Sequence, residues 1–278
     1  MKKITRRSFM AAAGLTVAAL ALTACGGSSS TASSAAASSV ASSAAASSAA
    51  ATELTTVEAG KLTMATNAAF PPYEMTTDAG EFEGIDIETA QAIADKLGLE
   101  LQIDDMDFDA ALLSVQQGKA DIVMAGVTVT DERKAVMDFS DSYATGIQSI
   151  IVPEGSDIAS PDDLAGKMIG TQRGTTGYIY CSDDFGDETV VAYDDGLTAV
   201  QALNNGQVDA VVIDNAPAKE FVAANPGLVI LDTSYAEEDY AIGMAKGSSL
   251  EDAVNAVLEE LKADGTLQSI VDKYITAE

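Results

Sequence analysis

Two charged residues stand where the sequence could bind a zwitterion. Arg133 lies in "AGVTVTDERKAVMDFS" (residues 125–140), in a chain with only 15 Lys plus Arg against 43 Asp plus Glu. Asp214 ends the apolar segment "VDAVVID". A guanidinium binds a carboxylate through paired hydrogen bonds, and a carboxylate suits an ammonium. Together they could bind an α-amino acid, which carries both groups on one carbon. The alternative for Arg133 is a solvated charge on a helix or a surface ion pair with Asp131 or Asp138.

A weak internal repeat supports this pairing. "VQQGKADIVMAG" ends at Gly126 and "LNNGQVDAVVID" ends at Asp214, and both read as a helix end, a glycine, two residues, an aspartate and an apolar strand. Glycine just past a helix suits the left-handed position there, so structure alone explains that half of the repeat. Ligands of open α/β sheets bind beyond the carboxyl ends of strands. The repeat therefore predicts a site with a cation near one strand end and an anion at the other.

The elements that must position these residues alternate along the chain. Hydrophobic periodicity predicts helices over 86–97, 109–117 and 196–204 and after Gly174, and strands over 61–66, 99–103, 121–125, 167–171, 189–193 and 209–213. Such alternation is typical of parallel sheets covered by helices.

The N-terminal region is expected to direct export. Residues 1–24 have a basic head and an apolar stretch too short to span a membrane, which is typical of a signal peptide. "LTAC" resembles a bacterial lipobox, so Cys25 is the expected lipidation site; the alternative is an ordinary cleaved signal with a chance cysteine. "TRRSFM" also resembles a twin-arginine signal, which leaves the export route open. Residues 25–53 are rich in Ala and Ser and are expected to form a disordered tether, with a helical rod as the alternative.

Composition excludes several classes of function. The net charge of −28 and the lack of a basic patch argue against a nucleic-acid partner. The chain has no His, which removes Ser-His-Asp and Cys-His catalysis and the commonest metal ligand. The acidic run "DDMDFD" lacks the spacing of a calcium loop and is expected to be solvated, so no metal or other cofactor is predicted. Cys181 is expected to be a small buried or half-buried hydrophobe.

A series of motifs resembles the polar amino acid-binding proteins of ABC transporters, the extracellular solute-binding proteins of family 3. They are "TNAAFPPYEM", "GEFEGIDIETAQAIADKLG", "FDAALLSVQQGKADIVMAGVTVTDERKAVMDFSDSY", "IGTQRGTTG", "VDAVVIDNAPA" and "LKADGTLQSIVDKY". The resemblance runs from about residue 60 to the end. It implies a type II periplasmic-binding-protein-like α/β fold with two α/β lobes joined by two hinge strands. Lobe 1 would take residues 54–145 plus 241–278 and lobe 2 residues 146–240, with hinges near 144–148 and 238–243.

The resemblance also implies a set of ligand contacts. The α-carboxylate would be held by Arg133 with Gly126, Thr128 and Thr176, and the α-ammonium by the Gly126 carbonyl, Thr128 and Asp214. Phe70 and Phe108 would enclose the ligand side chain, whereas Tyr73 is expected to pack in the core. The expected ligand-binding residues are Asn67, Phe70, Phe108, Ala125, Gly126, Thr128, Arg133, Gln172, Thr176 and Asp214.

The identity of the ligand side chain stays open at this point. Asn67 and Gln172 are neutral and suit a polar side chain such as that of glutamine, whereas Glu74 would suit a cation. The sequence therefore predicts a polar or basic L-amino acid, delivered to an ABC permease by a monomer that is lipid-anchored on the outer face of the cytoplasmic membrane. The alternatives are a surface-tethered amino-acid sensor and a periplasmic dehydratase of the same fold, although the chain is not expected to be an enzyme.

Overall fold

The computed structural model describes residues 54–275. The predicted signal peptide, the lipidation site at Cys25 and the tether over 25–53 lie outside the described residues. Within residues 54–275, no helix is long and apolar enough to cross a membrane.

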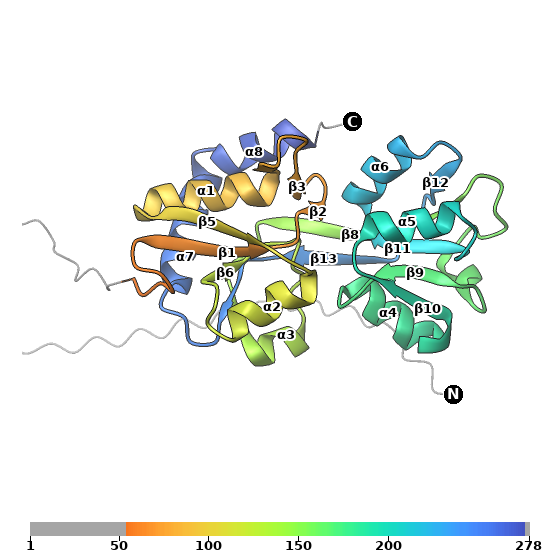
Figure 1. The fold of residues 1–278 in the computed structure, drawn as a ribbon, viewed down its shortest axis with the longest axis horizontal. Coiled ribbons are helices and arrows are strands. Elements are labelled where there is room, and N and C mark those ends of the chain that lie inside the picture. Colours follow the sequence, from red (N-terminus) through yellow and green to blue (C-terminus); the bar gives the residue numbers. More distant parts are fainter. Residues whose placement is uncertain (1–53, 276–278) are drawn as a thin grey trace, which may run out of the picture. The chain divides into compact units, whose positions relative to one another are not determined.

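The first of two large sheets has the strand order β5-β1-β6-β14-β7. Its strands β5, β1 and β6 are labelled in Figure 1. Its strands are β1 (Lys61–Thr66), β5 (Glu100–Asp105), β6 (Ile122–Val123), β7 (Met137–Phe139) and β14 (Gly243–Ala245). Strand β1 pairs in parallel with β5 and β6, whereas β14 is antiparallel to β6 and β7. Helices α1 (Ile85–Leu97) and α2 (Phe108–Gln116) pack on it, and helices α7 (Glu251–Ala263) and α8 (Thr266–Tyr274) pack against α1 and against each other. Apolar side chains such as Leu62, Met64 and Ile93 form the core between α1 and this sheet.

The second large sheet has the strand order β10-β9-β11-β8-β12, and β13 also pairs with β8. Its strands are β8 (Ala144–Pro153), β9 (Ile169–Gln172), β10 (Val190–Tyr193), β11 (Ala210–Asp214), β12 (Leu228–Ile230) and β13 (Ala236–Tyr240). The helices packed on it are α4 (Thr176–Phe185), α5 (Gly196–Asn204) and α6 (Asn215–Ala224). Cys181 on α4 is free and fully buried, as predicted.

A small third sheet places Glu74 beside helix α1. It consists of β2 (Ala69–Phe70), β3 (Glu74–Thr76) and β4 (Phe82–Glu83). Gly84 joins β4 to α1 with φ of 133°, and a Cβ there would lie 2.2 Å from the carbonyl oxygen of Tyr73. Only glycine fits this backbone, which holds the start of α1 against β3.

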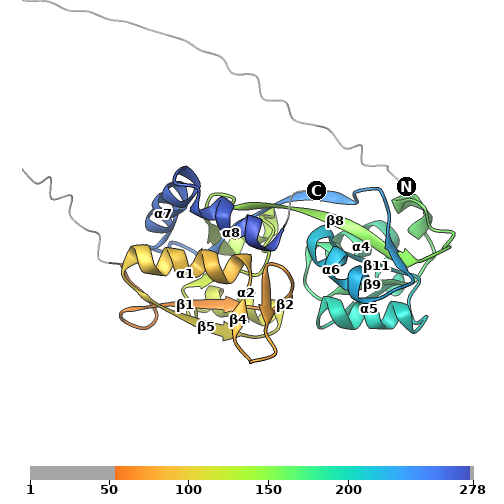
Figure 2. The same ribbon diagram turned by 90° about the horizontal axis from the view of Figure 1, so that it is seen from above.

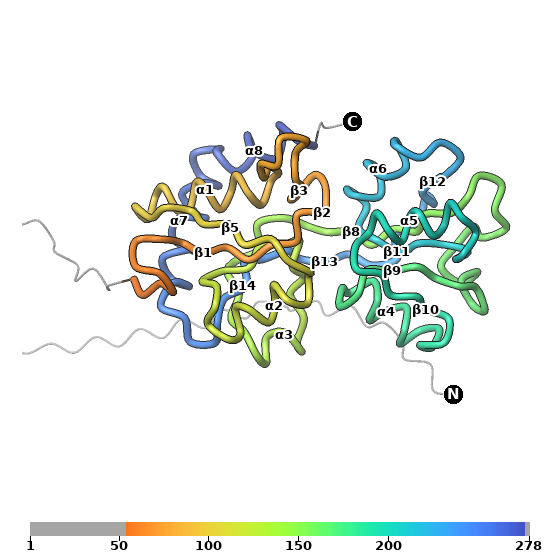
Figure 3. The backbone as a smooth tube through the Cα atoms, in the orientation of Figure 1, coloured from red at the N-terminus to blue at the C-terminus, as the bar shows by residue number. Residues whose placement is uncertain are grey.

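The chain passes between the two large sheets twice. It leaves the first sheet after β7 to enter β8, and it returns from β13 to β14. Strands β8 and β13 run side by side (Figures 2 and 3). They pair antiparallel, and the register sets Gly146 opposite Glu238. A Cβ on Gly146 would lie 2.5 Å from the ring of Tyr240, so this glycine allows the strand to pass over that ring. The segments predicted as hinges therefore pair with one another.

The strand predictions differ from the structure in the direction of some strands and in the ends of most of them. Neither large sheet is purely parallel, because β8 and β14 enter antiparallel to their neighbours. The strand predicted over 121–125 is limited to Ile122–Val123. The backbone turns away beyond it, and Gly126 has φ of 54°, which is outside the range of a strand. By contrast, the predictions for 61–66 and 196–204 match β1 and α5 residue for residue.

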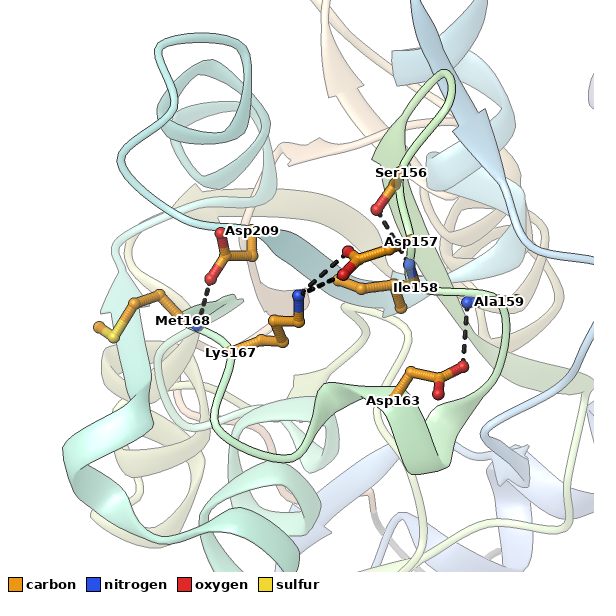
Figure 4. Close-up of polar contacts among 8 residues, drawn as sticks. All are labelled: Ser156, Asp157, Ile158, Ala159, Asp163, Lys167, Met168 and Asp209. Carbon is orange, nitrogen blue, oxygen red and sulfur yellow. Dashed lines mark hydrogen bonds and ion pairs between the residues drawn. The ribbon is translucent and has the colours of Figure 1, made fainter.

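The connection between β8 and β9 contains the short 3₁₀ helix η1 (Pro161–Leu164) and is tied down by polar contacts (Figure 4). Lys167 Nζ contacts both carboxylate oxygens of Asp157 at 3.0 and 3.1 Å. The amide of Met168 donates to Asp209 Oδ2 at 2.8 Å, which fixes the start of β9 beside β11. These exposed contacts hold a surface loop in place.

Candidate functional site

A single cavity brings together residues from both large sheets and from the small one. Its free volume is about 30 Å³, room for roughly two water molecules. The lining residues are Asn67, Phe70, Glu74, Phe108, Ala125, Gly126, Thr128, Arg133, Gln148, Gln172, Thr175, Thr176, Ile213, Asp214 and Tyr240. All ten residues predicted from the sequence for ligand binding are in this set.

Arg133 is buried in the wall of the cavity, with 8% of its surface exposed. It lies on the short helix α3 (Asp131–Val136), where Thr130 caps the helix by accepting a hydrogen bond from the Arg133 amide. Its Nη1 donates to the Thr128 carbonyl at 2.8 Å and its Nη2 to the Gly174 carbonyl at 3.1 Å. Because a guanidinium has five N–H donors, three remain for another acceptor.

The surroundings of Arg133 favour a bound anion. Its guanidinium carbon lies 5.3 Å from the centre of the Phe108 ring, a cation–π distance. Burial lowers the pKa of Arg133, and the negative charge of Glu238 opposes that effect more than any other charge. A carboxylate beside the guanidinium would replace the hydration that burial removes. The alternative of a surface ion pair is wrong, because Arg133 is buried and Asp138 pairs with Lys246 at 2.6 Å.

Asp214 lies at the carboxyl end of β11 and is 2% exposed. Its Oδ1 caps helix α6 by accepting from the Ala216 amide at 3.0 Å. Its Oδ2 accepts from the Ile147 amide and from the Tyr240 hydroxyl, both at 2.8 Å. Burial raises the pKa of Asp214 to about 6 despite these three donors. A cation next to this carboxylate would favour its charged form.

Gly126 lines the cavity at a position where a larger residue would be too close to its neighbours. With φ of 54°, a Cβ there would lie 2.9 Å from Phe70 and 3.2 Å from Tyr240. The Gly126 amide donates to Asp86 Oδ2 at 3.0 Å. That N–H is therefore engaged behind the cavity.

Three hydrogen bonds join the walls of the cavity. Thr128 Oγ1 lies 3.4 Å from Thr176 Oγ1, and Gln172 Nε2 donates to Asn67 Oδ1 at 2.8 Å. The third is the bond from Arg133 to the Gly174 carbonyl. Thr176 also begins α4, whose first N–H groups have no partner within the helix and favour an anion.

Two buried acids lie together at one end of the cavity. Glu74 lines the cavity, Asp86 lies behind it, and both are fully buried. Among the described residues, neither carboxylate oxygen of Glu74 has a hydrogen-bond partner, and Asp86 Oδ1 also has none. The pKa of Glu74 lies well above its usual range, because burial and the negative charge of Asp86 both favour the protonated form. Burial likewise raises the pKa of Asp86, to about 6.

Sequence reasoning missed several lining residues. Gln148, Thr175, Ile213 and Tyr240 line the cavity but were not predicted. Gln148 is brought to the cavity by the pairing of β8 with β11, which sets it opposite Asp214, and local sequence patterns do not show this long-range register. Tyr73, expected to pack in the core, is 3% exposed and stacks on Phe70 with ring centres 6.0 Å apart.

The described residues show no sign of a metal site. No group of three or more His, Cys, Asp or Glu residues within 54–275 is placed to hold a metal ion. In the run "DDMDFD", Asp105, Asp107 and Asp109 are exposed, which fits the predicted solvated face.

Comparison with known proteins identifies the family. The sequence model of the bacterial extracellular solute-binding proteins, family 3, matches residues 62–277. The chain belongs to this family. Among the family 3 relatives, the arginine-binding extracellular protein ArtP of Bacillus subtilis (strain 168) is 33% identical over 230 residues, covering 78% of this chain and 87% of ArtP.

Solved structures support the same family 3 assignment. An ancestral arginine-binding protein bound to arginine is 42% identical with a TM-score of 0.74, covering 78% of this chain and 98% of that one. The ancestral protein bound to glutamine is 41% identical with a TM-score of 0.75, covering 79% and 100%. The predicted fold class, two α/β lobes joined by two hinge strands, is confirmed. The chain is a solute-binding protein of the extracellular family and not an enzyme.

Proposed function

We propose that this protein captures a polar or basic L-amino acid between its two sheets and delivers it to an ABC permease. The observation that carries the proposal is one cavity holding a buried cation, Arg133, and a buried anion, Asp214. An α-amino acid presents the complementary charges on two groups bonded to the same carbon, so both residues can be paired by the same ligand. The relatives named for binding arginine and the ancestral structure with glutamine support this substrate class.

Binding would require the walls of the cavity to separate and close again. An amino acid is larger than the roughly 30 Å³ of free volume. The three bonds that join the walls would be exchanged for bonds to the ligand. Arg133 would donate hydrogen bonds to the ligand carboxylate. The side-chain amides of Asn67 and Gln172 would form hydrogen bonds with a polar side chain of the ligand. The paired strands β8 and β13, with Gly146 opposite Glu238, would provide the hinge.

Thermal stabilisation of the protein in the presence of each of the twenty L-amino acids tests this function. A ligand that binds only the folded state raises its stability by RT ln(1 + [L]/Kd), about 4 kcal/mol at 1,000 times Kd. We expect a large upward shift of the unfolding temperature with arginine, lysine or glutamine. If none of the twenty amino acids shifts it, and none co-purifies with the protein, the proposed function is wrong.

Glu74 favours a basic side chain over a neutral one. Glu74 is among the lining residues and both of its carboxylate oxygens lack hydrogen-bond partners, so a guanidinium or ammonium that reached them would satisfy them. The groups that face it are Asp86, Asp105, Tyr73 and Tyr143, all acidic or neutral, while Glu83 on the adjacent β4 is exposed. No cation among them competes with the ligand for Glu74.

The pH dependence of affinity tests this preference. A protonated Glu74 must lose its proton to pair with a cation, so binding of arginine should release a proton and become tighter as pH rises. The slope for arginine should exceed the slope for glutamine. Replacing Glu74 with glutamine should remove that difference and weaken arginine binding by about 10- to 100-fold, while glutamine affinity changes by less than about threefold. Equal slopes for the two ligands in the unaltered protein, measured by calorimetry, would exclude Glu74 as the cation partner.

The division of the chain and its anchorage complete the proposal. Residues 54–145 plus 241–278 would form lobe 1 and residues 146–240 lobe 2, joined through β8 and β13. Residues 1–24 would direct export, Cys25 would carry a lipid on the outer face of the cytoplasmic membrane, and residues 25–53 would tether the binding unit. The protein would act as a monomer. Incorporation of a labelled fatty acid that is lost on replacing Cys25 with serine tests the anchor.

A further inference from the structure

Glu238 lies just behind the cavity, on the strand that returns the chain to the first sheet. It is 6% exposed and sits in the middle of β13. Its Oε2 accepts hydrogen bonds from Thr128 Oγ1 at 3.1 Å and from Gln148 Nε2 at 3.0 Å. Glu238 Oε1 makes no hydrogen bond of ordinary geometry within the described residues. The Tyr180 hydroxyl faces the same carboxylate, and burial together with the charge of Glu238 raises the pKa of Tyr180 to about 12. A buried acid thus contacts one of the hydroxyls that line the cavity.

The backbone fixes this contact. The Val129 amide donates to the Asp239 carbonyl at 3.0 Å, and the Ala241 amide donates to the Val127 carbonyl at 3.1 Å. These two bonds flank Thr128, which also forms a bridge with Tyr240. The distance between Thr128 and Glu238 is therefore set by main-chain register and does not depend on a flexible side chain alone.

The donor and acceptor count then sets the direction of the hydroxyl. An amide nitrogen only donates, so Glu238 Oε2 acts as an acceptor toward Gln148. An ionised carboxylate has only acceptor sites, and the single proton of Thr128 therefore points at Glu238. Because that proton is used, Thr176 must be the donor in its 3.4 Å contact with Thr128. The hydroxyl of Thr176 therefore donates to Thr128, and the hydroxyl of Thr128 donates to Glu238.

We propose that Glu238 is a positioning residue for amino-acid recognition. It accepts a hydrogen bond from the Thr128 hydroxyl, so that this hydroxyl can act toward the ligand only as an acceptor. Thr128 then accepts from the α-ammonium and cannot donate to a carboxylate, while the proton of Thr176 can turn to the α-carboxylate. Two residues of the same type, Thr128 and Thr176, thereby bind different groups of the zwitterion, the ammonium and the carboxylate. The inference rests on the proposed function, because it assigns a direction to groups of the same site.

Glu238 should therefore decide how strongly the site prefers an amino acid to the same molecule without its amino group. The probes are L-arginine with 5-guanidinopentanoic acid, which is arginine lacking the α-amino group. Glu238→Gln keeps the size of the side chain and allows an N–H to face Thr128. It should weaken arginine binding by about tenfold or more. The affinity for 5-guanidinopentanoic acid should change by less than about threefold, because no ammonium is involved.

The matched control is Glu237→Gln, the neighbouring acid on β13, which is exposed. It removes the same charge from the same strand and should leave both affinities unchanged. An equal loss for arginine and for its deaminated analogue in Glu238→Gln would overturn the inference and indicate general damage to the site. Failure of the unaltered protein to bind any amino acid would instead reject the proposed function.

A double-mutant cycle keeps the inference falsifiable if the deaminated analogue binds too weakly to measure. Thr128→Val removes the hydroxyl but keeps the shape of the side chain. If Glu238 acts through that hydroxyl, Glu238→Gln should weaken arginine binding by less than about threefold in the Thr128→Val background. Additive losses, with the full tenfold effect retained, would show that Glu238 does not act through Thr128.

Discussion

Replacing Arg133 with alanine is expected to weaken amino-acid binding by more than about 100-fold. Two charge-assisted hydrogen bonds to a carboxylate contribute about 1.5–3 kcal/mol each, and each 1.4 kcal/mol is a factor of ten in affinity. The unfolding temperature of the protein without added ligand should change little. Arg133 is costly to bury, and water entering the space that its side chain leaves can donate to the Thr128 and Gly174 carbonyls.

Arg173 provides the matched control for this result. It is the other arginine within residues 54–275, it directly precedes Gly174, and its side chain is 55% exposed. Its contact with Asp194 is 3.5 Å long and lies outside the cavity. Arg173→Ala should leave affinity within about twofold, because exposed ion pairs contribute little. Similar losses for both variants in calorimetric titrations would mean that general positive charge, and not the Arg133 position, governs binding.

Replacing Asp214 with asparagine is expected to weaken the affinity for amino acids by about 100-fold. The affinity for ligands that lack an amino group should change little. Asparagine keeps an oxygen that can cap α6 through the Ala216 amide, but it carries no charge to pair with an ammonium. Asp214→Ala should also lower the free energy of unfolding, because the Ile147 amide and the Tyr240 hydroxyl would lose their acceptor. Parallel binding and thermal-unfolding measurements on the two variants separate the two effects.

The pKa of Asp214 gives this prediction a pH dependence. Burial raises that pKa to about 6, so in the protein without ligand this group stabilises the fold fully below its unfolded pKa of about 4. That contribution is lost as pH rises through 6. Affinity for an amino acid should change in the opposite direction, increasing from pH 5 to pH 7, because the ammonium needs the ionised carboxylate. A neutral ligand such as glutamine whose affinity stays flat over this range would remove Asp214 as the ammonium partner.

The sequence predicts the parts of the site that depend on local patterns. Strand 61–66 and helix 196–204 follow from hydrophobic periodicity and agree with β1 and α5. Asp214 could be placed at the end of its strand because the repeat aligns it with Gly126. The shorter strand at Ile122–Val123 was not predictable in the same way, since a run of apolar residues does not show where the backbone turns into a cavity wall.

Contacts between distant segments account for what the sequence leaves open. Glu238 and Thr128 are 110 residues apart, and Glu238 stands in the acidic run "AEEDY", which reads as solvated. Burial of Glu74 and Asp86 side by side also depends on packing of β3 against α1, which local patterns do not specify. The two carbonyls that hold Arg133 likewise come from separate segments, at Thr128 and Gly174.

Calorimetric titration with the amino acid that stabilises the protein most, beside its analogues without the α-amino and without the α-carboxylate group, tests the central claim most directly. For arginine these analogues are 5-guanidinopentanoic acid and agmatine. If Arg133 and Asp214 bind the two ends of one zwitterion, the amino acid should bind one-to-one and each analogue at least about 100-fold more weakly. An analogue that binds as tightly as the amino acid would contradict the account, because one of the two buried charges would then have no role in recognition.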